Sequence, residues 1–188
     1  DYDFPVNDGC GPDLQPVEYI RELIMDEGVA RSSFIVDGIR YSKEFFASRA
    51  DDVMVLRLTS SEKGALSFKA VLSRQENAAA GVEHKKCGRR KLHAATLEGS
   101  LESGIPGKKG ISYKVSMTVA SSDGKAVYSD GTITLTGASE AILIISAATS
   151  YSAEGTIFPG ERYVSFCDSL LDAAAHMDYN KLINRHIA

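Results

Sequence analysis

The 188 residues, 44% of them hydrophobic and 24% charged, are typical of one globular domain with a buried core. A net charge of −4 at pH 7 argues against a general nucleic-acid binder, because such proteins are usually basic. No stretch approaches the roughly 20 consecutive apolar residues that span a bilayer, so the sequence predicts neither nucleic acid nor a membrane as a partner.

The first residues do not resemble a secretion signal, because segment 1–13 is acidic and is interrupted by Gly and Pro. The chain also begins with Asp1 instead of Met. Two origins fit this start, a processed product and a piece of a longer protein, and we expect the second.

Alternation of apolar and polar residues dominates residues 1–150 and predicts β-strands. Segment 17–31 is ambiguous, since its intrinsic propensity favours a helix. Segment 53–58 is apolar at both alternating positions, so both faces of that strand are expected to be covered. Segment 66–72 alternates more simply and predicts one apolar and one polar face.

The clearest strand spans residues 111–119, with its apolar side chains expected to face the core and its polar side chains expected to face water. The polar set is Ser112, Lys114, Ser116 and Thr118. Segment 132–136 alternates Thr with Ile and Leu, and segment 141–145 is continuously apolar, as expected of a central strand buried on both faces.

Three Asp-Gly pairs separate these segments: Asp37-Gly38, Asp123-Gly124 and Asp130-Gly131. A type I′ turn needs positive φ at both central residues, and Asp-Gly adopts such a turn at low cost. Each pair therefore predicts the tip of a hairpin. Many short strands with turns at this spacing indicate an antiparallel sandwich.

Two segments, 73–91 and 99–110, are predicted to be loops, because the first lacks a period and the second is rich in Gly. After Tyr151 the period becomes helical. One apolar stripe is expected to be buried: Tyr163, Phe166, Cys167, Leu170, Leu171 and Ala174. A second helix is expected to begin near Asp178 or Tyr179.

The residues that could carry chemistry are few. Asp168, Asp172 and His176 share one helix face and could hold a metal, but a solvated face explains the spacing better. The basic run 85–91 could bind phosphate or nucleic acid, but a solvated loop is the better interpretation, given the negative net charge. The remaining histidines are His84, His93 and His186, and no nucleophile motif accompanies them.

Glycosidases need two carboxyl groups that face each other across a sugar. Asp51 and Asp52 are adjacent on a strand and so point in opposite directions, and they are expected to end it. Glu18 and Glu22 are the other pair of carboxylates. The sequence therefore predicts no catalytic residue, no cofactor-binding residue, no metal ligand and no cofactor.

The three cysteines, Cys10, Cys87 and Cys167, are odd in number and far apart, so they indicate neither a zinc site nor a redox pair. Cys167 is expected to be a small buried apolar residue. A disulfide between Cys10 and Cys87 is an open alternative that the spacing does not support.

A long tract resembles the N-terminal domain of glycoside hydrolase family 95, which contains mostly α-L-fucosidases and some α-L-galactosidases. The matching residues run as Tyr19-x-Arg21-Glu22-Leu23, Ala30-Arg31-x-Ser33-Phe34-x-Val36-Asp37-Gly38-x-x-Tyr41-x-Lys43-Glu44-x-Phe46-Ala47-Ser48 and Asp52-x-x-Val55-x-Arg57-Leu58. Segments 137–151 and 179–187 resemble the family's last sandwich strand and the start of its helical linker. The resemblance implies that segment 17–31 is a strand, in preference to a helix.

The resemblance implies a mainly β chain, with an antiparallel β-sandwich of the super-sandwich type at 1–158, truncated at its N-terminal side, and a C-terminal helical linker at 159–188. In this family an (α/α)6 catalytic barrel and a small β-domain follow. An inverting hydrolysis uses a Glu and an Asp of the barrel, so no catalytic residue of the family has a counterpart in this chain.

The expected function is that of a non-catalytic N-terminal domain that supports and shapes the barrel of a hydrolase resembling α-L-fucosidase. The expected partners are the barrel of the same parent chain, carbohydrate at the interface between the domains, and a second copy of this chain. The alternative is an independent carbohydrate-binding or protein-interaction module. The resemblance implies a secreted or periplasmic parent.

Leu182 and Ile183 are expected to lean on the barrel in a longer parent. In this chain the terminal segment is expected either to fold back onto the sandwich or to pair with a second copy. On this interpretation Leu182→Glu leaves the sandwich folded and changes only self-association.

Overall fold

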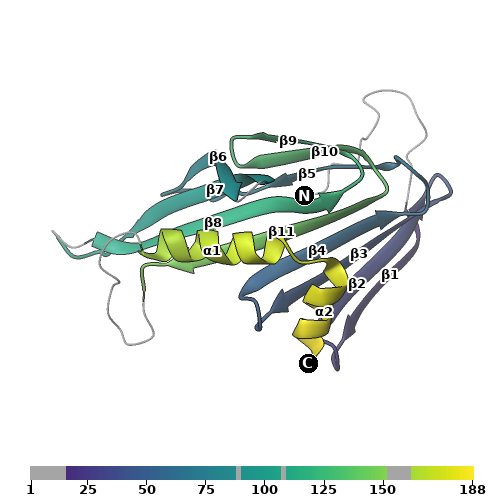
Figure 1. Ribbon diagram of the computed structural model, residues 1–188, viewed down its shortest axis with the longest axis horizontal. Coiled ribbons are helices and arrows are strands. Elements are labelled where there is room, and N and C mark those ends of the chain that lie inside the picture. Colours follow the sequence, from purple (N-terminus) through teal and green to yellow (C-terminus); the bar gives the residue numbers. More distant parts are fainter. Residues whose placement is uncertain (1–15, 88–89, 107–108, 152–161) are drawn as a thin grey trace.

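The computed structural model describes residues 16–87, 90–106, 109–151 and 162–188, which form two antiparallel sheets and two C-terminal helices (Figure 1). The mainly β, antiparallel fold with helices at the C-terminal end is therefore confirmed. The strands are β1 (Val17–Ile24), β2 (Val29–Val36), β3 (Ile39–Ser48), β4 (Val53–Ser60), β5 (Leu66–Val71), β6 (Ala79–Cys87), β7 (Arg90–Glu102), β8 (Lys109–Ser122), β9 (Lys125–Ser129), β10 (Thr132–Ala138) and β11 (Glu140–Thr149). The helices are α1 (Arg162–Ala175) and α2 (Tyr179–Ile187). The expected boundary between sandwich and linker, at 158/159, lies outside the described residues.

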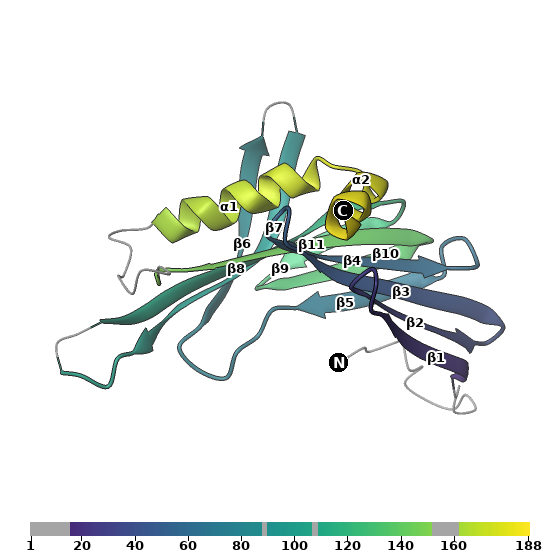
Figure 2. The ribbon, with the colours of Figure 1, turned by 90° about the horizontal axis from the view of Figure 1, so that it is seen from below.

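The large sheet is the middle layer of the fold. Its order is β1-β2-β3-β4-β11-β8-β7-β6, and β5-β10-β9 form a small sheet. The helices lie on one face of the large sheet and the small sheet lies on the other (Figure 2). Two apolar clusters follow from this arrangement: Val55, Ile144 and Leu171 belong to the helix side, and Leu58 and Leu143 to the side of the small sheet. The prediction that 53–58 and 141–145 are covered on both faces is confirmed.

Two of the three Asp-Gly pairs adopt the expected turn. Asp37 and Gly38 have φ of 52° and 78°, and they join β2 to β3 with Val36 paired to Ile39. Asp130 and Gly131 have φ of 44° and 72°. These positive values fit a type I′ hairpin.

The pair Asp123-Gly124 joins β8 to β9 without positive φ at either residue, and these strands belong to different sheets, so the predicted hairpin is wrong at this pair. Gly is required here because a Cβ atom on Gly124 would lie 2.7 Å from the carbonyl oxygen of Thr136. The side chain of Asp123 accepts hydrogen bonds from the backbone N–H of Ser139 at 2.7 Å and of Glu140 at 3.2 Å. The turn thereby fixes the junction between β10 and β11.

These bonds make a prediction about acid stability. The backbone hydrogen bonds from Ser139 and Glu140 lower the pKa of Asp123 from 3.8 to about 2. A carboxyl whose pKa is lower in the folded state stabilises the fold above the unfolded value, and this contribution is lost as the pH falls through the folded value. We expect Asp123→Ala to lower the urea midpoint at pH 7 and the two proteins to converge near pH 2. Equal midpoints at pH 7 would contradict this role.

The prediction of a loop at 73–91 holds for 73–78, which connect β5 to β6, but it is wrong for the longer part that forms β6 and the start of β7. β6 pairs with β7 along its whole length, from Ala79 opposite Glu98 to Cys87 opposite Arg90. β6 is an edge strand, where a polar and charged sequence without apolar alternation is tolerated and protects against aggregation. The predicted loop at 99–110 is also shorter than expected, because β7 continues to Glu102 and β8 begins at Lys109.

The polar face of β8, which was predicted to be exposed to solvent, is buried. Lys114 and Ser116 are 0% exposed, and Thr118 is 1% exposed. Helix α1 packs on β8 and β11 and covers this face. Alternation identified the strand correctly, but it could not show that a helix 50 residues further along the chain lies on the polar side.

The C-terminal helices bury most, but not all, of the predicted stripe. Cys167, Leu171 and Ala174 are buried, as expected, whereas Phe166 is 52% exposed, so its predicted burial is wrong. Burial raises the pKa of the Cys167 thiol. The alternative disulfide between Cys10 and Cys87 concerns Cys10, which lies outside the described residues.

Helix α2 folds back onto the sandwich, which confirms the first of the two expected fates of the terminal segment. Leu182 is 0% exposed and lies in one apolar cluster with Val29 and Phe46. The ring of His186 stacks on the ring of Phe46 at 4.7 Å between centroids. The expectation that Leu182 can be replaced by Glu without unfolding the sandwich is therefore wrong, because its partners lie within this chain.

Candidate functional site

The sequence suggested Asp168, Asp172 and His176 as a metal site or a solvated face, and the structure places them otherwise. Asp168 turns to the sheet, where its Oδ1 lies 3.0 Å from Nζ of Lys114. Nδ1 of His176 lies 2.6 Å from the carbonyl oxygen of Asp172. No group of three or more His, Cys, Asp or Glu side chains converges within the described ranges. The solvated-face interpretation is thus wrong for Asp168.

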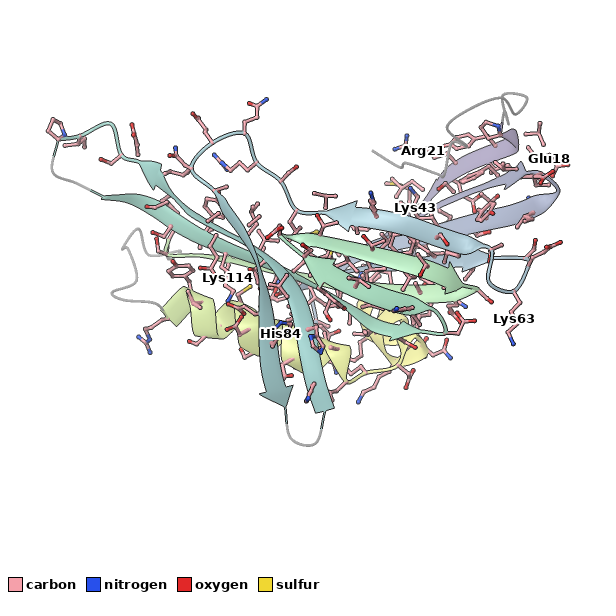
Figure 3. All side chains as sticks on the ribbon, turned by 90° about the horizontal axis from the view of Figure 1, so that it is seen from above. Glu18, Arg21, Lys43, Lys63, His84 and Lys114 are labelled. Carbon is pink, nitrogen blue, oxygen red and sulfur yellow. The ribbon has the colours of Figure 1, made fainter. Side chains whose placement is uncertain are left out.

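Lys114 is the most deeply buried charge in the described part of the chain. Its ammonium lies 2.7 Å from Glu83, 3.2 Å from Glu98 and 3.0 Å from Asp168, whose side chains are 24–44% exposed. Burial alone disfavours the charged form, but hydrogen bonds to Glu83 and Asp168 outweigh burial and raise the pKa of Lys114. The cluster fastens α1 to β6, β7 and β8 (Figure 3).

The carboxylates considered for glycosidase chemistry lie at two places: Asp51 and Asp52 in the turn between β3 and β4, and Glu18 and Glu22 on β1. Asp51 accepts a hydrogen bond from Nε of Arg185 at 2.9 Å and so ties α2 to the turn after β3. Asp52 has φ of 52° in that turn, which agrees with the expectation that the two residues end a strand. Glu18 lies 2.6 Å from Arg40, near the free edge of the sheet.

A polar groove of about 400 Å³ opens on the helix side of β1–β4, beside α2. Its centre is Glu44, which accepts hydrogen bonds from Nε of Arg31 and from the hydroxyl of Tyr179, both at 2.8 Å. Arg57 lies 3.4 Å from Glu44 and 2.7 Å from Glu140, and its guanidinium lies 4.7 Å from the centre of the Tyr179 ring.

The electrostatics of this groove do not suit acid catalysis. Burial opposes the charge of Glu44, but the hydrogen bonds from Tyr179 and Arg31 outweigh it and lower the pKa of Glu44. A glycosidase acid needs a raised pKa so that the carboxyl is protonated near neutral pH. The groove can hold hydroxyl groups or charges, but it lacks a proton donor of this kind.

The free edge of the large sheet is apolar. On β1, Tyr19 is 59% exposed, Ile20 54% and Leu23 60%, and Met25 beyond the strand is 78% exposed. Glu18 and Arg21 lie on the same strand (Figure 3). These side chains project from both faces of the strand, since Ile20 lines the groove beside Glu44 whereas Tyr19 stacks on Phe34. An unpaired edge strand with several exposed apolar side chains favours contact with a partner.

Aromatic rings also gather on the other face of β1–β3. The ring centroids of Tyr19 and Phe34 are 6.3 Å apart, and those of Phe34 and Tyr41 are 5.6 Å apart, with interplanar angles of 24° and 25°. These rings stack on one another across the strands. Phe34 has a ring on each side, whereas Tyr19, on the edge strand, has Phe34 on one side only.

The basic run 85–91 belongs to the hairpin of β6 and β7 instead of a loop. The side chains of residues 85–90 lie outside the described part, so the expected solvated loop is replaced by a strand pair whose tip is not described. His84 and His93 meet on this hairpin, which the sequence gave no reason to expect. The described helices include none that is long and apolar enough to cross a membrane.

Comparison with known proteins gives consistent matches. A family model described as glycosyl hydrolase family 65, N-terminal domain, matches residues 9–154. Alpha-L-fucosidase 2 of Arabidopsis thaliana is 27% identical over 192 residues, which cover 89% of this chain and 23% of that protein. A putative kojibiose phosphorylase from the human microbiome has a similar structure, with a TM-score of 0.59 at 9% identity, over 93% of this chain and 24% of that chain. The chain thus spans about a quarter of the length of each relative.

Proposed function

The chain belongs to the glycosyl hydrolase family 65 N-terminal domain family, and we propose on this premise that it is a non-catalytic domain that docks on and shapes the catalytic barrel of a longer carbohydrate-active hydrolase. The resemblance to an N-terminal glycoside hydrolase domain is confirmed. The matching family model describes family 65, whereas the resemblance seen in the sequence was to family 95. The Arabidopsis relative is named as an α-L-fucosidase. The division into a sandwich at 1–158 and a linker at 159–188 is part of the proposal.

The observation that carries the proposal is the apolar edge of β1. Full burial of one large apolar side chain is worth about 1.5–3 kcal/mol, so leaving several exposed is costly unless a partner covers them. The end of α2 lies at the same edge, because Nε2 of His186 is 3.3 Å from the carbonyl oxygen of Gly28, in the turn between β1 and β2. A polypeptide that continues after residue 188 would emerge beside Leu23 and Met25. A following barrel is therefore well placed to cover β1.

The polar groove beside β1 supports a second part of the proposal, contact with carbohydrate at the domain interface. Ile20 and Glu22 of β1 form one wall, and Arg31, Ser33 and Ser42 lie near them. Hydroxyl and charged side chains of this kind form hydrogen bonds with sugar hydroxyls. If a barrel covers β1, this groove opens onto the seam between the two domains.

The alternative, an independent carbohydrate-binding module, is less well supported. Such modules offer flat exposed rings, whereas Tyr19, Phe34 and Tyr41 stack on one another and the sequence has no Trp. A homodimer that covers β1 is the other alternative. Sedimentation distinguishes it, since a dimer would form in the chain alone and would be lost in Leu23→Glu.

The isolated chain is expected not to cleave aryl α-L-fucosides or fucosylated oligosaccharides, because Glu44, the carboxylate at the centre of its polar groove, has a lowered pKa and is therefore not suited to donate a proton. The measurement is product release over a buffer blank. Turnover that a point substitution within this chain abolishes would overturn the proposed function.

The docking surface has its own test in the longer protein. Leu23→Glu should loosen the contact between this domain and the barrel, observed as faster proteolysis between the domains and lower turnover. Val127→Glu is the matched control, because Val127 is 51% exposed but lies on β9 of the small sheet and not on β1. If both variants behave as the unmodified protein does, β1 is not the docking surface. If the coding sequence downstream of residue 188 contains no barrel, the proposed function itself fails.

A further inference from the structure

Two histidines face each other across the β6–β7 hairpin. His84 of β6 is directly opposite His93 of β7 in the antiparallel register. Their Nδ1 atoms are 2.6 Å apart and their ring centroids 4.6 Å apart. Residues directly opposite in a sheet project from the same face, so both imidazoles lie on one side of the hairpin. Figure 3 shows His84 on the hairpin, in the half of the molecule away from β1.

The surroundings hold one imidazole firmly and leave the other open. The ring of His93 lies 5.8 Å from the ring of Tyr128, whose hydroxyl accepts a hydrogen bond of 3.0 Å from the backbone N–H of Val119. The hydroxyl of Thr118 donates to the carbonyl oxygen of His93 at 2.7 Å. His84 is exposed. The pair thus combines a fixed ligand position with access from water.

Two neutral imidazoles in this position can bind one metal ion together. Their Nδ1 atoms are only 2.6 Å apart, a distance at which a proton or another cation must lie between the two nitrogens. Unprotonated imidazole nitrogen is a preferred ligand of Zn²⁺, Ni²⁺ and Cu²⁺. Nitrogens that share a tetrahedral ion at about 2.0–2.1 Å lie about 3.3 Å apart, so the rings need to separate by only some tenths of an ångström.

We propose that His84 and His93 form a two-histidine site for a divalent transition metal such as Zn²⁺ or Ni²⁺, with water as the remaining ligands. The described side chains supply no third His, Cys, Asp or Glu, so the site differs from the closed four-ligand sites that hold structural zinc. The bound ion would clamp β6 to β7. The basic run 85–91 adjoins the pair and repels cations, so we expect modest affinity.

The sequence predicted no metal site because nothing in the linear spacing indicates one. His84 and His93 are nine residues apart, unlike the short spacings of recognised zinc motifs. Only the register of a strand that the sequence analysis assigned to a loop brings them together. This inference does not depend on the proposed function.

The test is calorimetric titration of the chelator-treated chain with Ni²⁺ and with Zn²⁺ at pH 7.5. We expect one bound ion per chain, with affinity at least tenfold weaker in His84→Gln and in His93→Gln. His176→Gln is the control, because His176 is an exposed histidine in the turn after α1, and it should leave the affinity unchanged. Binding should also weaken as the pH is lowered, since protons compete with the metal ion for the ligand nitrogens.

A second measurement uses the unmodified chain, so its result does not depend on whether the variants fold. In the unmodified chain, paramagnetic Ni²⁺ should broaden the NMR signals of the His84 and His93 rings before those of His176 and His186. Absence of binding, or binding that both Gln variants retain, would overturn the proposal. The close contact between the two rings would then be only a hydrogen bond from one Nδ1 to the other. Broadening of all four histidines at the same Ni²⁺ concentration would overturn it as well.

Discussion

Lys114→Met is expected to lower the free energy of unfolding by about 3 kcal/mol, as removal of one partner from a buried ion pair does. The ammonium of Lys114 is fully buried between Glu83, Glu98 and Asp168. Without it, three carboxylates face one another beneath α1. The expected loss is at the lower end of the usual 3–5 kcal/mol, because these carboxylates are partly exposed to water.

The measurement is urea unfolding followed by circular dichroism at pH 7. Lys125→Met is the matched control, since Lys125 is exposed on β9, and such surface changes usually stay within about 0.5 kcal/mol. Because the pKa of Lys114 is raised above 10.5, its stabilising effect should be complete below pH 10.5 and should be lost only as the pH rises through the folded value. Equal stabilities of Lys114→Met and the control would show that water alone, without the ammonium, offsets the repulsion among these carboxylates.

Lys114 also shows where sequence reasoning reaches its limit. The alternation in 111–119 located β8 correctly, and two Asp-Gly pairs located type I′ hairpins, because both signals depend on neighbouring residues. Which face of β8 is buried depends instead on α1, whose Asp168 completes the charge cluster from far along the chain. A polar strand face is buried only when distant partners satisfy it, and periodicity carries no information about those partners.

The candidate sites follow the same rule. Local spacing predicted that Asp51 and Asp52 end a strand, and both lie in the turn between β3 and β4. The Glu44 network could not be inferred, because its members come from β2, β3, β4, β11 and α2. For His84 and His93, even the element type was missed, since an edge strand rich in charge lacks the alternation that identifies strands.

Leu182→Ala is expected to destabilise the chain by about 3 kcal/mol, because a buried Leu→Ala change costs about 2–5 kcal/mol in transfer and cavity terms. Leu182 is 0% exposed and lies in the same apolar cluster as Val29 of β2 and Phe46 of β3. The loss should appear in the unfolding of the sheets as well as the helix, since one cooperative core is disrupted.

Ile187→Ala is the matched control on the same helix, because Ile187 is 44% exposed and its truncation should cost about 1 kcal/mol or less. Unfolding should be followed by circular dichroism and by hydrogen exchange of backbone amides, so that the helix and the strands are observed separately. Coincident transitions that shift together in Leu182→Ala would show that α2 is part of the sandwich core. In that case the Arg185–Asp51 ion pair and the His186–Phe46 stack hold the end of α2 in a fixed position on the sandwich. If Leu182→Ala melts only the helix, α2 is a detachable linker and the core ends with α1.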